Sequence, residues 1–427
     1  MESNSTNRNL NFKSPLIKSN QGGKRTYYVK SLIAVAIFLI LIIVELVKSG
    51  GYLDEIIGVI SVFYIIFSRK RIERRDLITI VILAIVVLIG IISNIAYGIN
   101  DSAFSVAVDV VAETKLLFAY FAMKYFLSDR EKQATINMLL PLAKIFTLSA
   151  FGCSVISLFA DIGMSGSVRY GIREFKFIFA FSFQYVAVYM LFFGILVCNT
   201  KMRDNARIAY YVMAIISLVL ATKGPPIMFS IIFVGLAIYF KKHDKISPTV
   251  FLIGAVILAA AGWFQIETYL LNENAPRRIF FEYAFKTANK YFPLGSGFAT
   301  YGSDQAARHY SKLYYQYGFD QLSGMSPENS AFLSDTFWPM AIGQFGWIGS
   351  IIYLIVYIRV FFTFKNKKFT NQRKAFIYAV FLQYMIHAIG SAILSSSAGL
   401  IGFMAIALFT ISDDESERKR SKIKIHV

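Results

Sequence analysis

Charged residues are scarce in this sequence: they make up 16% of the chain, whereas hydrophobic residues make up 56%. Soluble globular domains carry about 25% charged residues, so this composition excludes an ordinary soluble protein. Cysteine is scarce as well, since Cys153 and Cys198 are the two in the chain and both lie in apolar runs. They exclude a disulfide framework and a cysteine-ligated metal centre.

Several motifs of enzyme chemistry are also absent. The sequence contains no Gly-rich phosphate loop, no zinc-ligand motif and no serine-hydrolase elbow. Gly295 and Gly297 form an isolated G-x-G pair, which alone does not predict a nucleotide site. A cleavable signal peptide is missing too, because residues 1–30 are polar and basic and no small-residue cleavage site follows the first apolar run. We expect that run to be retained as a membrane anchor.

Apolar runs of about 20 residues recur along the chain, and each is long enough to cross a bilayer as a helix. They predict an all-α polytopic membrane protein with about twelve transmembrane helices. The run 374–411 holds the last two if it turns near Gly390–Ser397, and a re-entrant element is the alternative. The predicted spans are 31–47, 52–68, 77–97, 103–127, 138–160, 175–198, 206–222, 226–240, 248–264, 336–363, 374–392 and 395–411.

Lysine and arginine indicate the orientation of these spans. With the N-terminus inside the cell, inner segments hold 29 of these residues and outer segments hold 11. This bias places both termini in the cytoplasm. It also explains the net charge of +18 without a nucleic-acid partner. The predicted layout is a tail at 1–30, nine spans over 31–264, an outer loop at 265–335, three spans over 336–411 and a tail at 412–427.

Six cations on the outer face run against this bias. Contact with lipid headgroups or plain surface solvation would account for any one of them, and an anion site is the sharper hypothesis. Lys223 is the most telling, because it lies in a tight turn between two spans and Gly224 beside it would let a ligand approach the backbone. The six predicted ligands of an anion are Arg169, Arg173, Lys223, Arg277, Arg278 and Arg308.

Short motifs in this layout resemble the family of O-antigen polymerases (Wzy-type) and O-antigen ligases. Their order, with a long outer loop before the tenth span, is similar to that family over about residues 77–411. The motifs are Arg169-Tyr170-Gly171, Thr222-Lys223-Gly224, Arg277-Arg278 followed by Pro293-Leu294-Gly295-Ser296-Gly297, Glu328-Asn329-Ser330, and Gln344-Phe345-Gly346-Trp347-Ile348-Gly349.

The resemblance implies a GT-C-like glycosyltransferase of the bacterial inner membrane. Its donor and acceptor would be glycans on undecaprenyl pyrophosphate, with no metal, cofactor or nucleotide sugar and with a chain-length-regulating co-polymerase as a possible partner. Two positions depart from the family pattern: Lys223 replaces an arginine, and Glu328 stands where ligases have histidine. Lysine keeps the charge but loses bidentate geometry. Glu328 argues for a polymerase over a ligase.

Three residues are hypotheses for the base that accepts the proton of the acceptor hydroxyl. Glu328 is the first choice, His309 the second and Asp335 the third. A helix-start carboxylate and a solvated loop histidine are the alternatives for the first two. Tyrosines in the same loop would stack on sugar rings or pack as an amphipathic helix on the membrane surface. These are Tyr310, Tyr314, Tyr315 and Tyr317.

Asp109 and Glu113 lie one helical turn apart within the fourth predicted span, so they share a face, while Lys115 points elsewhere. Charged groups at this depth are functional candidates. Pairing with Lys144 or Arg359 is one expectation, and handling of substrate or protons is the other. Such carboxylates, with His387 as a further polar group, would also suit a flippase or transporter of lipid-linked oligosaccharide. The long loop and the lack of an internal repeat disfavour that class.

Overall fold

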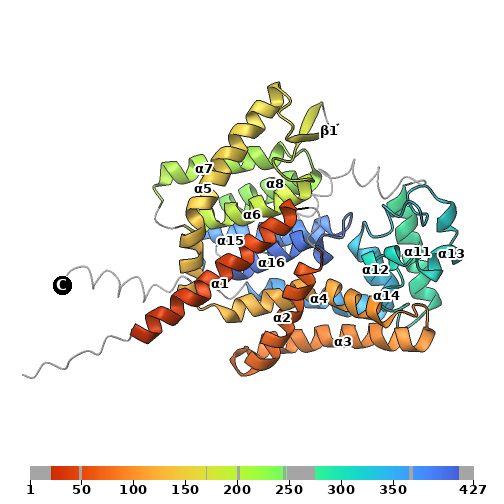
Figure 1. The fold of residues 1–427 in the computed structure, drawn as a ribbon. Coiled ribbons are helices and arrows are strands. Elements are labelled where there is room, and N and C mark those ends of the chain that lie inside the picture. The colour runs from red at the N-terminus through yellow and green to blue at the C-terminus, as the bar shows by residue number, and fades with distance from the viewer. Residues whose placement is uncertain are drawn as a thin grey trace, which may run out of the picture.

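The computed structural model describes residues 21–47, 51–169, 171–199, 202–243, 247, 275–364 and 369–412. The predicted span 248–264, residues 265–274 of the predicted loop and most of both predicted tails lie outside this part. Within it the chain is almost entirely helical, with 14 α-helices and one β-hairpin (Figure 1).

The first eight helices follow the apolar runs of the sequence closely. Hydropathy predicts them well because a run of side chains that avoid water is a local property of the chain. They are α1 (Gln21–Leu46), α2 (Leu53–Ser68), α3 (Arg74–Tyr97), α4 (Ala103–Phe126), α5 (Asp129–Phe159), α6 (Ser182–Cys198), α7 (Asp204–Val219) and α8 (Gly224–Tyr239).

The second half begins with short helices and ends with three apolar ones. A 3₁₀ turn (Ile393–Ser395) divides the last apolar run, which confirms the predicted turn near Gly390–Ser397. The helices are α11 (Pro276–Lys290), α12 (Asp304–Arg308), α13 (Lys312–Gln316), α14 (Phe337–Thr363), α15 (Asn371–His387) and α16 (Ser397–Phe409).

Among the described residues, four helices are long and apolar enough to cross a membrane: Tyr28–Leu46 within α1, and the whole of α3, α5 and α14. Their mean hydropathies lie between 1.8 and 2.9. Helices α6, α8 and α16 are apolar but shorter. These four helices suggest a membrane protein.

The predicted span 175–198 is wrong at its start, because α6 begins at Ser182. The preceding residues form a hairpin of β1 (Ser165–Arg169) and β2 (Ile172–Phe175). A turn follows β2, in which Phe177 has φ +53° and Phe179 donates its backbone N–H to Lys176 O at 3.2 Å, so the helix cannot start at residue 175. Phe175 donates its backbone N–H to Leu220 O at 3.0 Å. The buried phenylalanines of this stretch are Phe175, Phe177 and Phe179.

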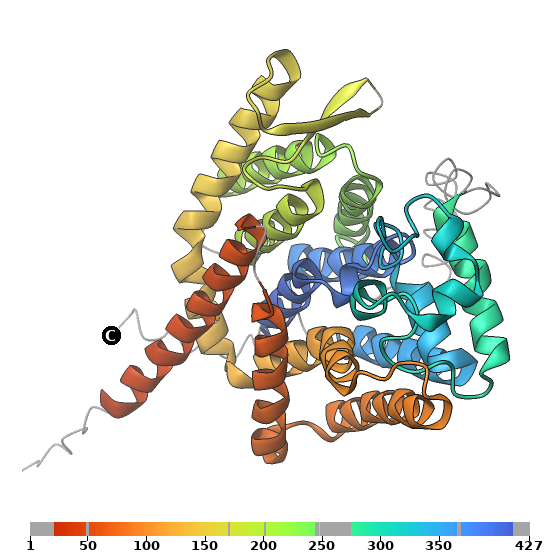
Figure 2. The ribbon, with the colours of Figure 1, turned by 45° about the vertical axis from the view of Figure 1, so that its right-hand side comes forward.

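Two hydrophobic cores support the fold. The larger runs through α4, α6, α15 and α16. The smaller lies inside the long polar segment, where Phe280, Tyr301, Tyr314 and Phe319 pack together. Figure 1 shows α11, α12 and α13 grouped on one side of the molecule, and in Figure 2 α3 and α14 run side by side next to that group. We call residues 275–335 the outer unit.

Candidate functional site

Lys223 lies at the start of α8, where Gly224, Pro225 and Pro226 begin the helix. Its Nζ is 3.2 Å from Oε1 of Glu174 on β2. Burial works against the charge of that carboxylate, but hydrogen bonds from Ser182 and Ser167 and the charge of Lys223 outweigh it and lower the pKa of Glu174. Lys223 is therefore held between the hairpin and α8 as half of an ion pair.

Arg277 occupies the first turn of α11, directly after Pro276. Its Nε and Nη2 donate to Oδ2 of Asp335 at 3.1 and 2.7 Å. Burial raises the pKa of Asp335, while the charges of Arg277 and Lys223 act in the opposite direction. Because the charge of Lys223 also acts on Asp335, we group the two ion pairs as one candidate site.

His387 completes this site from the last turn of α15. The charges of Arg277 and Lys223 both act on its ring. Arg277 Nη1 also lies 4.0 Å from the point where a β-carbon on Gly390 would sit. We call Glu174, Lys223, Arg277, Asp335 and His387 the cation cluster. It gathers residues from β2, α8, α11, the segment before α14, and α15.

The other predicted anion ligands are placed differently. Arg278 is half-buried next to Arg277, and its charge acts on Glu282. Arg308 is exposed and pairs with Asp304 at 2.6 Å, on α12, which packs against α4. Arg173 is exposed on β2. The backbone of Arg169 ends β1, but its side chain lies outside the described part of the structure.

Of the three predicted bases, Asp335 lies in the cation cluster. Glu328 is exposed in the outer unit, where its charge acts on Tyr310. His309 is exposed at the end of α12. The structure does not bring either of these two into contact with the cluster. The sequence ranked Glu328 first and Asp335 third, whereas of the three it is Asp335 that the fold places next to a cation.

Sequence reasoning missed Glu174 entirely and considered His387 only as an intramembrane polar group. A single glutamate in an outer segment carries no motif. The signal that could have predicted Glu174 is the excess of cations in the predicted outer segments, since buried cations need partners of opposite charge.

The tyrosines of the outer unit differ in burial: Tyr314 is buried against Tyr301 and Phe319, whereas Tyr315 is exposed.

The Pro293–Gly297 and Gln344–Gly349 motifs meet in space and hold the outer unit in place. Gly346 has φ +64°, which breaks α14, and backbone N–H groups of the loop bond to the carbonyls beside the break. Ser296 N donates to Gly343 O and Gly297 N to Gln344 O, both at 2.9 Å. A β-carbon on Gly295 would lie 2.2 Å from Gly346 N. We call this contact the loop–helix junction.

Side chains of α3, of α4 and of the turn between them bond the next residues of the loop, Phe298 and Ala299. Asn94 bonds both backbone groups of Phe298 at 2.8 Å. Asn100 Nδ2 donates to Ala299 O at 2.7 Å, and Asp109 Oδ2 accepts from Ala299 N at 2.5 Å and from Gln344 Nε2 at 3.0 Å. Asp109 therefore connects α4 with both sides of the loop–helix junction.

The expected pairing of Asp109 and Glu113 with Lys144 or Arg359 is wrong. Arg359 instead bonds α3, through the hydroxyl of Thr79 at 2.9 Å. In the part of the chain that the structure describes, neither carboxylate forms an ion pair, and backbone and amide donors occupy Oδ2 of Asp109. Lys115 does point away from them, toward Asp54 and Glu55 on α2.

Across the described ranges, no group of three or more His, Cys, Asp and Glu side chains gathers where it could hold a metal ion. The cation cluster offers instead two cationic side chains, two carboxylates and an imidazole. Such a set can bind an anionic group and accept a proton. Comparison of the chain with models of protein families and with curated proteins found no match.

Proposed function

We propose that this protein is a polysaccharide polymerase of the outer face of the bacterial cytoplasmic membrane. It would join oligosaccharide repeat units carried on undecaprenyl pyrophosphate into O-antigen or capsule-type polysaccharide. The proposal includes about twelve spans with both termini in the cytoplasm. The observation that carries it is that Arg277 pairs with Asp335 while the charge of Lys223, from a distant part of the chain, acts on the same carboxylate.

The reaction needs cations where pyrophosphate departs. The acceptor hydroxyl attacks the anomeric carbon of the donor, the bond from that carbon to the pyrophosphate oxygen breaks, and the electron pair leaves with the pyrophosphate. Lys223 and Arg277, with Arg278 beside them, would stabilise that charge. Each charge-assisted hydrogen bond contributes about 1.5–3 kcal/mol, and donors fixed in advance act most strongly in the transition state.

Asp335 is the base that this geometry supports best. The proton of the acceptor hydroxyl would pass to its carboxylate, which stays ionised because Arg277 lies within hydrogen-bond distance. The burial that raises the pKa of Asp335 also makes its carboxylate a better proton acceptor than an exposed one. Glu328 and His309 remain predictions for this role.

A flippase or transporter of lipid-linked oligosaccharide is the second candidate. The observation that favours it is the pair of buried carboxylates on α4, because Asp109 Oδ1 and Glu113 Oε2 have no hydrogen-bond partner among the residues that the structure describes. Buried carboxylates of this kind serve proton or ion pathways in transporters. The cation cluster would then hold the pyrophosphate of a lipid in transit.

Reconstitution separates the two candidates. The purified protein in sealed vesicles would be given synthetic undecaprenyl-pyrophosphate repeat units, and products would be separated on a gel. A ladder of lengthening products, unchanged by EDTA, is expected for a metal-independent polymerase. A single unit that merely crosses the bilayer would identify a flippase, and transfer of one glycan to a lipid A core would identify an O-antigen ligase.

A further inference from the structure

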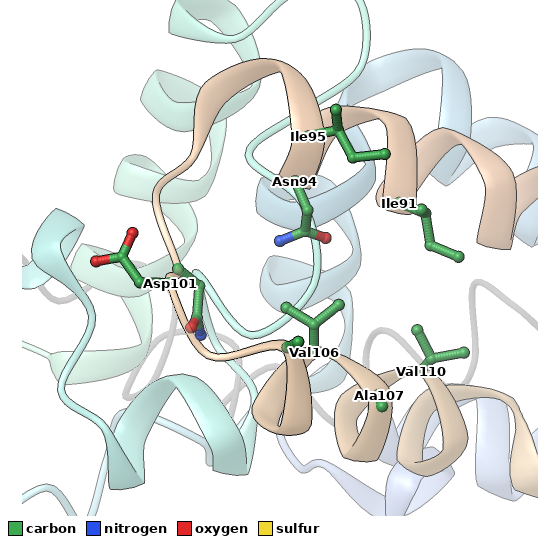
Figure 3. A pocket seen from close by; sticks show the side chains of 9 residues that line it. Ile91, Asn94, Ile95, Asp101, Val106, Ala107 and Val110 are labelled. Atoms are coloured by element: carbon green, nitrogen blue, oxygen red, sulfur yellow. The ribbon is translucent and has the colours of Figure 1, made fainter.

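A pocket of about 510 Å³ lies between the end of α3 and the start of α4 (Figure 3). Aliphatic side chains of the two helices face each other across it: Ile91 and Ile95 from α3, and Val106, Ala107 and Val110 from α4. Its volume falls in the range of about 300–1,000 Å³ that is usual for small-molecule sites. Ile95 is 80% exposed, so the pocket opens on the outside of the helix pair as a groove.

The polar groups of this groove are confined to one end. Asn94, Asn100 and Asp101 lie at or near the turn that joins the two helices. Asn94 and Asn100 bond the backbone of Phe298 and Ala299, and Asp101 pairs with Lys312 of α13 at 2.5 Å. One end of the groove therefore meets the outer unit, and the other continues along a helix long and apolar enough to span a membrane.

We propose that this groove binds the isoprenoid chain of the acceptor lipid, with the saccharide directed into the outer unit. This inference rests on the proposed polymerase function. An isoprenoid chain matches the aliphatic lining of the groove. A saccharide attached to its end at the turn between α3 and α4 would lie next to the outer unit, which contacts that turn. The groove would add a second lipid site, on helices other than those that build the cation cluster.

The charges decide between the two substrates. Departing pyrophosphate needs cations, and these lie in the cation cluster, so the donor head belongs there. The acceptor reacts at a sugar hydroxyl and keeps its lipid phosphate. Its chain can therefore bind in a groove whose acidic residue, Asp101, already pairs with Lys312. The outer unit touches both sites, through Arg277 at its beginning and through Phe298, Ala299 and Lys312 further along.

Single-turnover transfer in vesicles tests the inference. The donor has its acceptor hydroxyl blocked, and the acceptors carry the same saccharide on geranyl or undecaprenyl chains through a non-cleavable phosphonate. The wild type should prefer the undecaprenyl acceptor through a lower KM. Ala107→Trp fills the groove and should raise that KM about tenfold, the loss of roughly two buried methylenes. The KM values for the geranyl acceptor and for the donor should not change.

Leu88→Trp is the matched control, because Leu88 is exposed on α3 but does not line the groove. It should behave as wild type. An unchanged undecaprenyl KM in Ala107→Trp, a change in the donor KM alone, or an equal effect of Leu88→Trp would overturn the proposal.

Photo-cross-linking distinguishes failure of this site from failure of the polymerase function. A diazirine on the undecaprenyl chain of the acceptor should label peptides of α3 and α4 in the wild type and not in Ala107→Trp. Labelling of the groove by a protein that makes no polymer would keep the lipid site and remove the polymerase. Equal labelling by a diazirine phosphatidylethanolamine, or polymerisation without labelling of the groove, would remove the acceptor site instead.

Discussion

Asp335 and Arg277 influence each other directly, since two guanidinium N–H groups of Arg277 bond one carboxylate oxygen. Both are partly exposed, so a substrate can reach them: the side-chain exposures are 25% for Arg277 and 32% for Asp335. A bound pyrophosphate could share Arg277 with Asp335, because a guanidinium carries five N–H donors. The chemistry of the site therefore depends on how the guanidinium of Arg277 is shared between Asp335 and a bound anion.

Arg277→Ala should reduce polymerisation by about 10²–10³-fold, the usual cost of losing one donor to a developing negative charge. The rate of chain elongation with purified repeat units measures this effect. Lys286→Ala is the control, because Lys286 lies on the same helix, is exposed and pairs with Glu282. Equal rates for Arg277→Ala and wild type would remove Arg277 from the site.

Lys223→Gln should move the acid limb of the pH profile. Burial raises the pKa of Asp335 and the charge of Lys223 opposes that rise, so removing Lys223 should raise the pKa further. A carboxylate base is active above its pKa and inactive below it, so kcat/KM should be lost at a higher pH than in wild type. Lys286→Gln should leave the profile in place. A shift toward lower pH would contradict the role of Asp335 as base.

At the scale of elements, the loop–helix junction joins the outer unit to α14. The break at Gly346 leaves backbone groups of the helix without helical partners, and the loop supplies them through Ser296 and Gly297. Glycine is required on both sides, because a β-carbon on Gly346 would lie 2.7 Å from Gly295 N. The motif thus serves structure here.

Gly346→Ala should destabilise the protein by about 1–2 kcal/mol from the left-handed backbone alone, with the clash against Gly295 in addition. The loss would appear as a lower Tm in detergent. Gly152→Ala is the matched control, since Gly152 lies in α5 with open space around its α-carbon. That change should be neutral or stabilising by up to about 1 kcal/mol. An unchanged Tm in Gly346→Ala would show that the junction can relax.

Sequence patterns predicted most of these elements but few of their contacts. Apolar runs located α1–α8 and α14–α16 because hydropathy is local. The turn before α6 was missed, since Phe175, Phe177 and Phe179 lie inside an apolar run that also suits a helix. The break at Gly346 and the partners of Asp109 depend on residues far along the chain. Of the site, Lys223, Arg277 and Asp335 were predicted, whereas the pair of Arg277 with Asp335 and the partner of Lys223, Glu174, were not.

For the molecule as a whole, the predicted orientation places the outer unit and the hairpin on one side of the membrane. Exposed residues on both sides can report it after Cys153 and Cys198 are replaced by alanine. A membrane-impermeant maleimide on intact cells should label cysteines at Asp161 and Gln321 and spare those at Arg203 and His243, all of which are exposed positions. Labelling of the second pair in place of the first would reverse the orientation and place the cation cluster in the cytoplasm.

The loop–helix junction also constrains how the protein is made. The ribosome synthesises α3 and α4 before the loop. The partners Asn94, Asn100 and Asp109 are therefore already present when Phe298 and Ala299 are translated. The carbonyls of Gly343 and Gln344 that the loop needs are translated after all of these. The outer unit can therefore close only once this part of α14 has been made, so a nascent chain completes the loop–helix junction late in its own biogenesis.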